Sequence, residues 1–227
     1  MRKYEIAHLT SSHDIVTLQR VAPALPAFED AFSVFGRGAI LHTDTGQVAV
    51  EDLLPGDRVM TASGAYQTLL WHGSTTIIPG EQNARPEMGT MTRITADALG
   101  LARPALDIVF GPAARISHRG PGVRTLTGSD SAFVPVRDFI DQNQIIELTP
   151  SAPVQVYQLG FAGHEKIRVH GLEVESLHPG PLHQLGLRGD ALALYLSLFP
   201  QHRSLDDFGL MMQPRLRLRD LDLFDVA

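Results

Sequence analysis

Residues 34–64 read VFGRGAILHTDTGQVAVEDLLPGDRVMTASG, and this stretch decides the fold of the chain. Short aliphatic runs alternate in it with turn residues, above all at Gly46 and at Pro55-Gly56-Asp57. Glycine and Pro-Gly-Asp clusters between apolar runs are typical of tight turns between antiparallel strands. We therefore expect short hairpins here, with the Asp57 carboxylate bonded to its local backbone rather than serving in catalysis.

The same alternation continues to about residue 180. Further apolar runs occupy residues 106–110, 132–136, 145–148, 154–161 and 166–169, with Gly, Pro or Asp between them. Many short strands at close spacing favour a β sandwich or barrel over alternating helices and strands. The sequence predicts a mainly β domain.

Composition limits the classes of function. The 227 residues carry a net charge of -6, so nothing indicates a nucleic-acid or anionic-membrane partner. The absence of cysteine excludes disulfides, thiolate catalysis and thiolate metal sites. No apolar run is long enough to span a membrane, and the N-terminus lacks a signal-peptide pattern. A cytoplasmic location is the default expectation, with export without a leader left open.

Three blocks in order resemble the Hedgehog/intein (Hint) family, in particular its bacterial branch. They are FGRGAILHTDTGQVAVEDLLPGDRV at residues 35–59, DIVFGPAARI at 107–116, and HEKIRVHGLEVESLHPG at 164–180. The resemblance implies the Hint fold, a horseshoe-like β barrel or sandwich of short strands. It also implies a history of self-processing, in which a cysteine at the first position of the block attacks the carbonyl just before it.

The resemblance also assigns the catalytic positions, and two of them are occupied by aliphatic residues. The nucleophile position is Val34, which has no heteroatom with which to attack. The proton-donor position, the histidine of an S-P-x-H-R pattern, is Ala114 in the sequence GPAAR. Only the histidine of the closing block remains, as His164. The chain resembles a cysteine-less, degenerate member, and we expect it to be catalytically inactive.

One alternative keeps some self-processing. A shift of one position would bring the hydroxyl of Ser33 to the nucleophile site for an N-to-O acyl shift, with His118 replacing the missing donor. The simpler interpretation makes Ser33 a loop hydroxyl and His118 an exposed turn residue. A second alternative reuses the cleft around His164 for a metal ion or a small molecule.

Metal and cofactor sites are not expected. The best candidates for ligands are His170, His178 and His183, but prolines between the last two prevent the i, i+4 spacing of a helical zinc site. The sequence also contains no phosphate-binding glycine loop and no dinucleotide fingerprint.

Beyond residue 180 the pattern becomes helical. Residues 185–199, which begin with Leu185 and end with Phe199, predict a helix with a wide apolar surface that covers the β domain or binds a protein partner or a second copy. Arg215, Arg217 and Arg219 follow in a tail whose charge Asp220, Asp222 and Asp225 neutralise, so we expect a solvated tail or an intermolecular strand.

The sequence thus predicts three parts: an N-terminal segment at residues 1–33, a Hint-like β domain at 34–180, and a C-terminal helical extension with its tail at 181–227. The function that fits best is a binding or scaffold domain on an inactive Hint fold.

Overall fold

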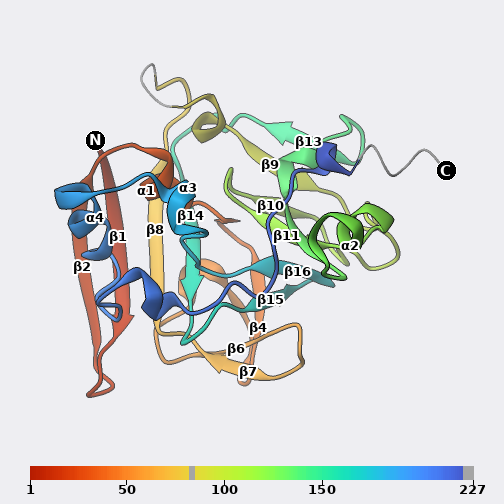
Figure 1. Ribbon diagram of the computed structural model, residues 1–227. Coiled ribbons are helices and arrows are strands. Elements are labelled where there is room, and N and C mark those ends of the chain that lie inside the picture. The colour runs from red at the N-terminus through yellow and green to blue at the C-terminus, as the bar shows by residue number, and fades with distance from the viewer. Residues whose placement is uncertain (82–84, 222–227) are drawn as a thin grey trace.

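The computed structural model describes residues 1–81 and 85–221, and antiparallel strands dominate it (Figure 1). The largest sheet has eight strands in the order β13-β9-β10-β3-β14-β8-β1-β2. Their bounds are β1 (Arg2–Leu9), β2 (Ile15–Ala22), β3 (Phe35–Gly36), β8 (Trp71–Ile77), β9 (Met91–Ile94), β10 (Ile108–Phe110), β13 (Ile145–Leu148) and β14 (Val154–Gly160). The short strand β3, which follows Val34 directly, therefore lies near the middle of this sheet.

Two four-stranded sheets complete the β structure. One has the order β12-β11-β16-β15 and the other β5-β4-β6-β7. Their strands are β4 (Ile40–Thr43), β5 (Gly46–Ala49), β6 (Arg58–Met60), β7 (Tyr66–Thr68), β11 (Arg115–His118), β12 (Ala132–Pro135), β15 (Lys166–Val169) and β16 (Leu172–Glu175).

The opening stretch forms the hairpins that its sequence predicts. The β4–β5 turn contains Gly46 at φ +131°, a backbone conformation that glycine adopts without steric cost. At the next turn Gly56 has φ +106°, and the backbone N–H of Leu54 donates to the Asp57 carboxylate at 2.8 Å. Asp57 thus bonds to its local backbone, as expected for this turn.

Helices are few and short. The α-helices are α1 (Pro26–Asp30), α2 (Pro121–Thr127), α3 (Leu182–Leu185) and α4 (Gly189–Leu196), and the 3-10 helices are η1 (Val50–Asp52), η2 (Pro86–Gly89), η3 (Val136–Phe139), η4 (Leu205–Phe208) and η5 (Leu218–Asp220). Among the described residues, no helix is long and apolar enough to cross a membrane.

The single helix predicted for residues 185–199 is wrong in its extent. The chain forms α3 and α4 instead, because Gly186 takes the left-handed conformation at φ +68° and ends α3. Gly189 then starts α4 with a positive φ of its own. Glycine at a helix C-terminus both satisfies the turn and interrupts the helical pattern, so an apolar run alone overestimates the length.

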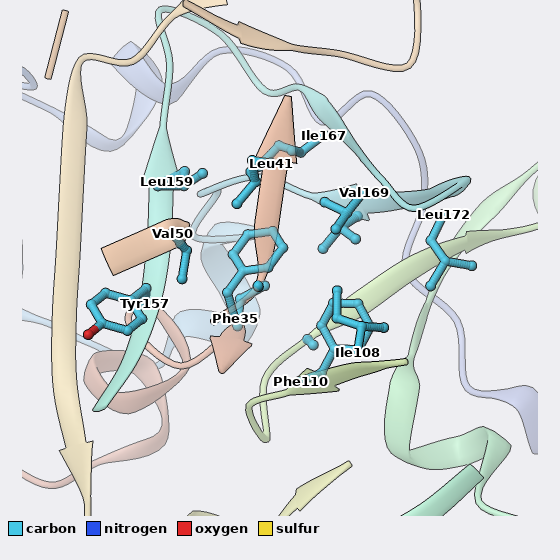
Figure 2. Packing of buried hydrophobic residues seen from close by; sticks show 14 of the residues in the cluster. Phe35, Leu41, Val50, Ile108, Phe110, Tyr157, Leu159, Ile167, Val169 and Leu172 are labelled. Carbon is cyan, nitrogen blue, oxygen red and sulfur yellow. The ribbon is translucent and has the colours of Figure 1, made fainter. Parts of the chain in front are cut away.

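The two largest of four hydrophobic clusters fill most of the interior. The larger one joins all three sheets and contains Phe35, Leu41, Phe110, Tyr157 and Ile167 (Figure 2). The smaller one lies under α4 and is aromatic: the Trp71 and Phe199 rings are 5.2 Å apart, and the Trp71 indole N–H donates to the Leu198 carbonyl at 2.8 Å. The C-terminal helical extension therefore packs on the β structure of its own chain.

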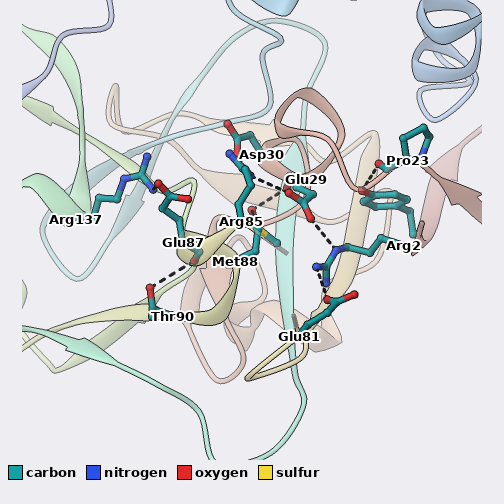
Figure 3. Close-up of polar contacts among 12 residues, drawn as sticks. Arg2, Pro23, Glu29, Asp30, Glu81, Arg85, Glu87, Met88, Thr90 and Arg137 are labelled. Carbon is teal, nitrogen blue, oxygen red and sulfur yellow. Dashed lines mark hydrogen bonds and ion pairs between the residues drawn. The ribbon is translucent and has the colours of Figure 1, made fainter. Parts of the chain in front are cut away.

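Part of the segment before Val34 packs in this interior, through residues that include Tyr4, Ile6, Phe28 and Phe32. Strand β1 lies between β2 and β8, and a buried charge network ties it to α1 (Figure 3). The carboxylate of Glu29, fully buried, accepts from Arg2 at 3.0 Å and from Arg85 at 2.9 Å. Strands from both sides of residue 33 belong to one sheet. The division of the chain at residues 33 and 180 stays a prediction.

Candidate functional site

The backbone of Val34 is fixed from both sides by neighbouring segments. Its N–H donates to the Tyr157 carbonyl at 3.1 Å, and its carbonyl accepts from the Gly111 N–H at 2.8 Å. Its side chain is 2% exposed and belongs to the larger hydrophobic cluster. The position that the family uses for a nucleophile is therefore a packed core position here.

The carbonyl of Ser33 is the group that a nucleophile at position 34 would attack. It accepts a hydrogen bond from the backbone N–H of Ala113 at 2.9 Å. A backbone donor on this oxygen is what an oxyanion site requires. The same carbonyl oxygen would lie 2.5 Å from a Cβ added at Gly111, so the loop after β10 approaches it more closely than a serine at that position permits.

Ala114 stands where the resemblance places the proton donor, and its side chain is a buried methyl group. Its side chain is 1% exposed and packs in the same cluster as Val34. Its carbonyl accepts from the Val136 N–H at 2.9 Å, which ties it to the start of η3. The two residues that the resemblance assigns to the nucleophile and the donor are thus both aliphatic side chains that contribute to packing.

The structure places the two rescue candidates in different surroundings. Ser33 is fully buried, and its hydroxyl donates to the Glu29 carbonyl at 2.8 Å. His118 is the last residue of β11, half-buried, with its ring 5.5 Å from that of Phe139, and it lines a separate cavity with Glu173. The expectation of an exposed turn for His118 is wrong, because β11 continues to this residue in its pairing with β12.

His164 lies in a buried network of charged groups. Its Nδ1 accepts from the Met212 N–H at 3.1 Å, which places the ring proton on Nε2. Nε2 lies 3.3 Å from Oε1 of Glu175, and the ring stacks on that of His178 at 4.6 Å. The histidine kept from the family pattern therefore faces a carboxylate.

Glu175, at the end of β16, is the centre of this network. Burial alone would raise its pKa, but the positive charge of Arg215, the contact with His164 and the charge of Arg115 outweigh it and lower the pKa to about 2. Arg215 donates from Nε to Oε1 at 2.9 Å, and Nη1 of Arg115 lies 3.5 Å from Oε2. One buried carboxylate thus contacts two guanidinium groups.

Sequence reasoning missed this network and treated the tail arginines as exposed. Arg215 also donates to the His178 carbonyl at 2.8 Å, while Arg217 forms two 2.7 Å bonds with Asp138. The expectation of a solvated tail is therefore wrong for Arg215 and Arg217, because buried or half-buried carboxylates receive both. Arg219 is exposed beside Asp220. Asp222 and Asp225 lie outside the described residues. The feature of the sequence that could have indicated these contacts is the alternation of apolar and charged residues in the tail.

The metal candidates occupy different structural settings. His178 accepts from the Gly180 N–H through Nδ1, and its Nε2 contacts the Gly209 carbonyl at 3.1 Å. His170 lies in the β15–β16 turn at φ +48°, and His183 is exposed on α3. Within residues 1–81 and 85–221, no three His, Asp or Glu side chains come together as a metal site requires.

A cavity of about 350 Å³ opens beside Val34. Its lining includes the charged side chains Arg115, Glu175 and Arg215 and residues of α1 and of the α3–α4 region. Its apolar lining includes Val34, Leu25, Leu185 and Leu187. The position that the resemblance assigns to the nucleophile therefore borders a concave, half-polar pocket of the size that small ligands occupy.

Two solved structures are similar to this chain. A GSH-linked, splice-inactive variant of the AceL NrdHF class 3 split intein is 12% identical at a TM-score of 0.40, over 64% of this chain and 98% of its own. A bacterial intein-like domain from Clostridium thermocellum is 14% identical at a TM-score of 0.43, over 63% of this chain and 98% of its own. No curated protein matches the chain significantly. The family model of the Hint domain matches residues 33–181, more than half of the sequence, and confirms the predicted fold. The chain belongs to the Hint domain family.

Proposed function

We propose that this Hint domain does not process itself and that it acts as a binding or scaffold domain. The observation that carries the proposal is the packing at position 34, where the Val34 side chain is 2% exposed within the hydrophobic core. An acyl shift needs a thiol, hydroxyl or amine next to the carbonyl of Ser33, and valine supplies none. With Ala114 at the donor position, the leaving nitrogen also lacks its proton source.

The integration of the N-terminal segment supports the same proposal. Strand β1 pairs with β2 over eight residues and with β8 over five. Tyr4 and Phe32, both fully buried, have ring centroids 4.6 Å apart. Scission before Ser33 or Val34 would leave this segment bound by its sheet and core contacts, so cleavage would not release a product in the folded state.

Mass spectrometry of the intact, denatured chain tests the proposal. Denaturation is needed because a cleaved N-terminal segment would otherwise stay bound. After long incubation with dithiothreitol or hydroxylamine, we expect the full mass of 24.8 kDa for the wild type and for Ser33→Ala. A fragment that starts at Val34, or one that starts at Ser33 and is absent from Ser33→Ala, contradicts the proposal.

The variant Val34→Cys with Ala114→His serves as the constructive control. It restores the thiol and the imidazole that the family pattern places at these positions. Thiol-dependent cleavage in this variant alone would show that the cleft geometry is competent and that the two aliphatic residues cause the inactivity. Cleavage in the wild type at the same rate would contradict the proposal.

The scaffold role includes a partner protein or a second copy bound through residues 185–199, and this stays a prediction. Tyr195, Leu198 and Phe199 face the chain's own aromatic cluster, so only the outer side of α4 is free to take part. Light scattering of the purified chain across a concentration series measures the oligomeric state, and Ala193→Glu on the exposed side of α4 would disrupt such a dimer.

A further inference from the structure

We propose that the cavity beside Val34 binds a small organic carboxylate with an apolar tail. This inference rests on the proposed function and adds the chemical class of the ligand. Two kinds of group line the cavity: hydrogen-bond donors that lack protein partners, and aliphatic side chains. The donors fit the carboxylate end of such a ligand, and the aliphatic side chains fit its apolar end.

Arg115 is the main anion-binding group of the cavity. Its side chain is 23% exposed, and it lines the cavity at the start of β11. Its polar contacts within the described residues are both long and both made by Nη1, to the Ala113 carbonyl at 3.4 Å and to Glu175 at 3.5 Å. The Nε and Nη2 groups remain for a ligand, and a guanidinium fork matches a carboxylate in two parallel hydrogen bonds.

Two further donors line the same cavity. Tyr195 of α4 is 1% exposed, and its hydroxyl has no hydrogen-bond partner in the described part of the chain. Burial raises the pKa of Tyr195, so the hydroxyl keeps the proton that it would donate. Gln158 is 4% exposed; its Oε1 accepts from the Leu159 N–H, while its NH₂ group is unpaired among the described residues. Both groups line the cavity and neither is sealed off from it, so a ligand that accepts hydrogen bonds can bind them in place of solvent.

The acidic groups of the cavity already have cationic partners and do not oppose an anion. Arg215 contacts Glu175 directly at 2.9 Å, closer than Arg115 does. Asp30, at the end of α1, is bonded to Nη2 of Arg85 at 2.6 Å (Figure 3). The charge of Arg115 is therefore the least compensated one in the wall, and a ligand carboxylate would complete its ion pair.

The aliphatic part of the lining fits an apolar tail. It consists of Val34 just before β3, Leu25 just before α1, and Leu185 and Leu187 in the α3–α4 region. At about 350 Å³ the cavity is at the small end of ligand sites, which fits a molecule of the size of hexanoate. The valine that removes the family's nucleophile thus becomes part of the surface that holds the tail.

Calorimetric titration of the intact chain with hexanoate tests the inference, with hexanamide as the neutral match. We expect hexanoate to bind about tenfold or more tightly than hexanamide, because only the carboxylate pairs with a buried guanidinium. Arg115→Gln should weaken hexanoate about tenfold and leave hexanamide unchanged, and Tyr195→Phe should weaken it by about threefold. Arg93→Gln, which removes an exposed arginine paired with Asp107, is the matched control and should bind as the wild type does.

Three results would overturn the ligand class: no heat with hexanoate at millimolar concentration, equal affinity for acid and amide, or equal competition by inorganic phosphate. The ratio of the hexanoate and hexanamide affinities is measured on the wild type, so the test can still be made if Arg115→Gln misfolds. Intact mass on the same samples separates the two proposals. Full mass without hexanoate binding rejects only the ligand class, whereas cleaved chain rejects the proposed function.

Discussion

Two regions near Val34, an aliphatic side and a charged side, differ in the groups that they bury. On one side, Val34 and Ala114 are aliphatic, and their backbone groups bond to neighbouring segments. On the other side, Glu175, Arg215 and His164 form a buried charged network. Buried ion pairs often contribute little net stability because desolvation offsets their attraction. The aliphatic side contributes to packing, whereas the charged side supplies groups that line the cavity for which we propose a ligand.

The largest expected effect comes from breaking the charged side. Glu175→Ala removes the carboxylate between Arg115 and Arg215 and leaves two guanidinium groups without it, which should lower the free energy of unfolding by about 3–5 kcal/mol. Urea denaturation measures the change. Glu173→Ala on the same strand, where a half-exposed carboxylate pairs with Lys166, is the control and should cost about 1 kcal/mol or less. An equal decrease in the free energy of unfolding for the two variants would show that the buried network contributes no more than an ion pair near the surface.

A steric change on the aliphatic side comes next. Gly111→Ser places a Cβ 2.5 Å from the Ser33 carbonyl oxygen, a backbone atom that cannot move freely. Overpacking of this kind should destabilise the chain by about 1–3 kcal/mol. Gly163→Ser, at a glycine with open space around its Cβ position, should change stability by less than about 0.5 kcal/mol. If Gly111→Ser left the stability unchanged, the loop after β10 would be able to shift and relieve the close contact.

Acid should weaken the charged side before it affects the aliphatic one. Burial is the main cause that lowers the pKa of His178 from 6.5 to about 4, so the unfolded chain binds this proton at higher pH than the folded chain does. Stability should therefore fall as the pH drops from 6.5 to 4, by about 1–2 kcal/mol after allowance for the part-exposed ring. Denaturation of the wild type and His178→Gln at these two pH values measures the difference. An identical pH slope in both would contradict the assignment.

The smallest expected effect concerns the hydroxyl next to the aliphatic side. Ser33→Ala removes the bond to the Glu29 carbonyl and should cost about 0.5–1.5 kcal/mol, the usual value for one buried hydrogen bond. Thermal unfolding gives the value. Ser63→Ala, in the exposed turn before β7, provides a reference for a hydroxyl near the surface. If Ser33→Ala were more stable than the wild type, the hydroxyl would be strained rather than satisfied.

The sequence by itself determined the Hint fold, which the family model confirms. Gly46, Gly56 and Asp57 specify their turns through local φ angles and a hydrogen bond three residues away, and such short-range effects are visible in a sequence. The assignment of Val34 and Ala114 to the nucleophile and donor positions rests on their places relative to the first two family blocks, and it stays a prediction.

Only the tertiary structure decided where the charged residues meet. Glu175 and Arg215 lie 40 residues apart in the sequence, and Arg115 and Glu175 lie 60 apart. No periodic pattern connects such residues, because their contact depends on how the C-terminal tail crosses the sheets. The division of the predicted helix at Gly186 also needed the structure, since an apolar run records burial but not where the backbone turns. Local backbone geometry therefore specifies the turns of the fold, whereas packing between segments far apart in the sequence brings together the charged residues of the cavity.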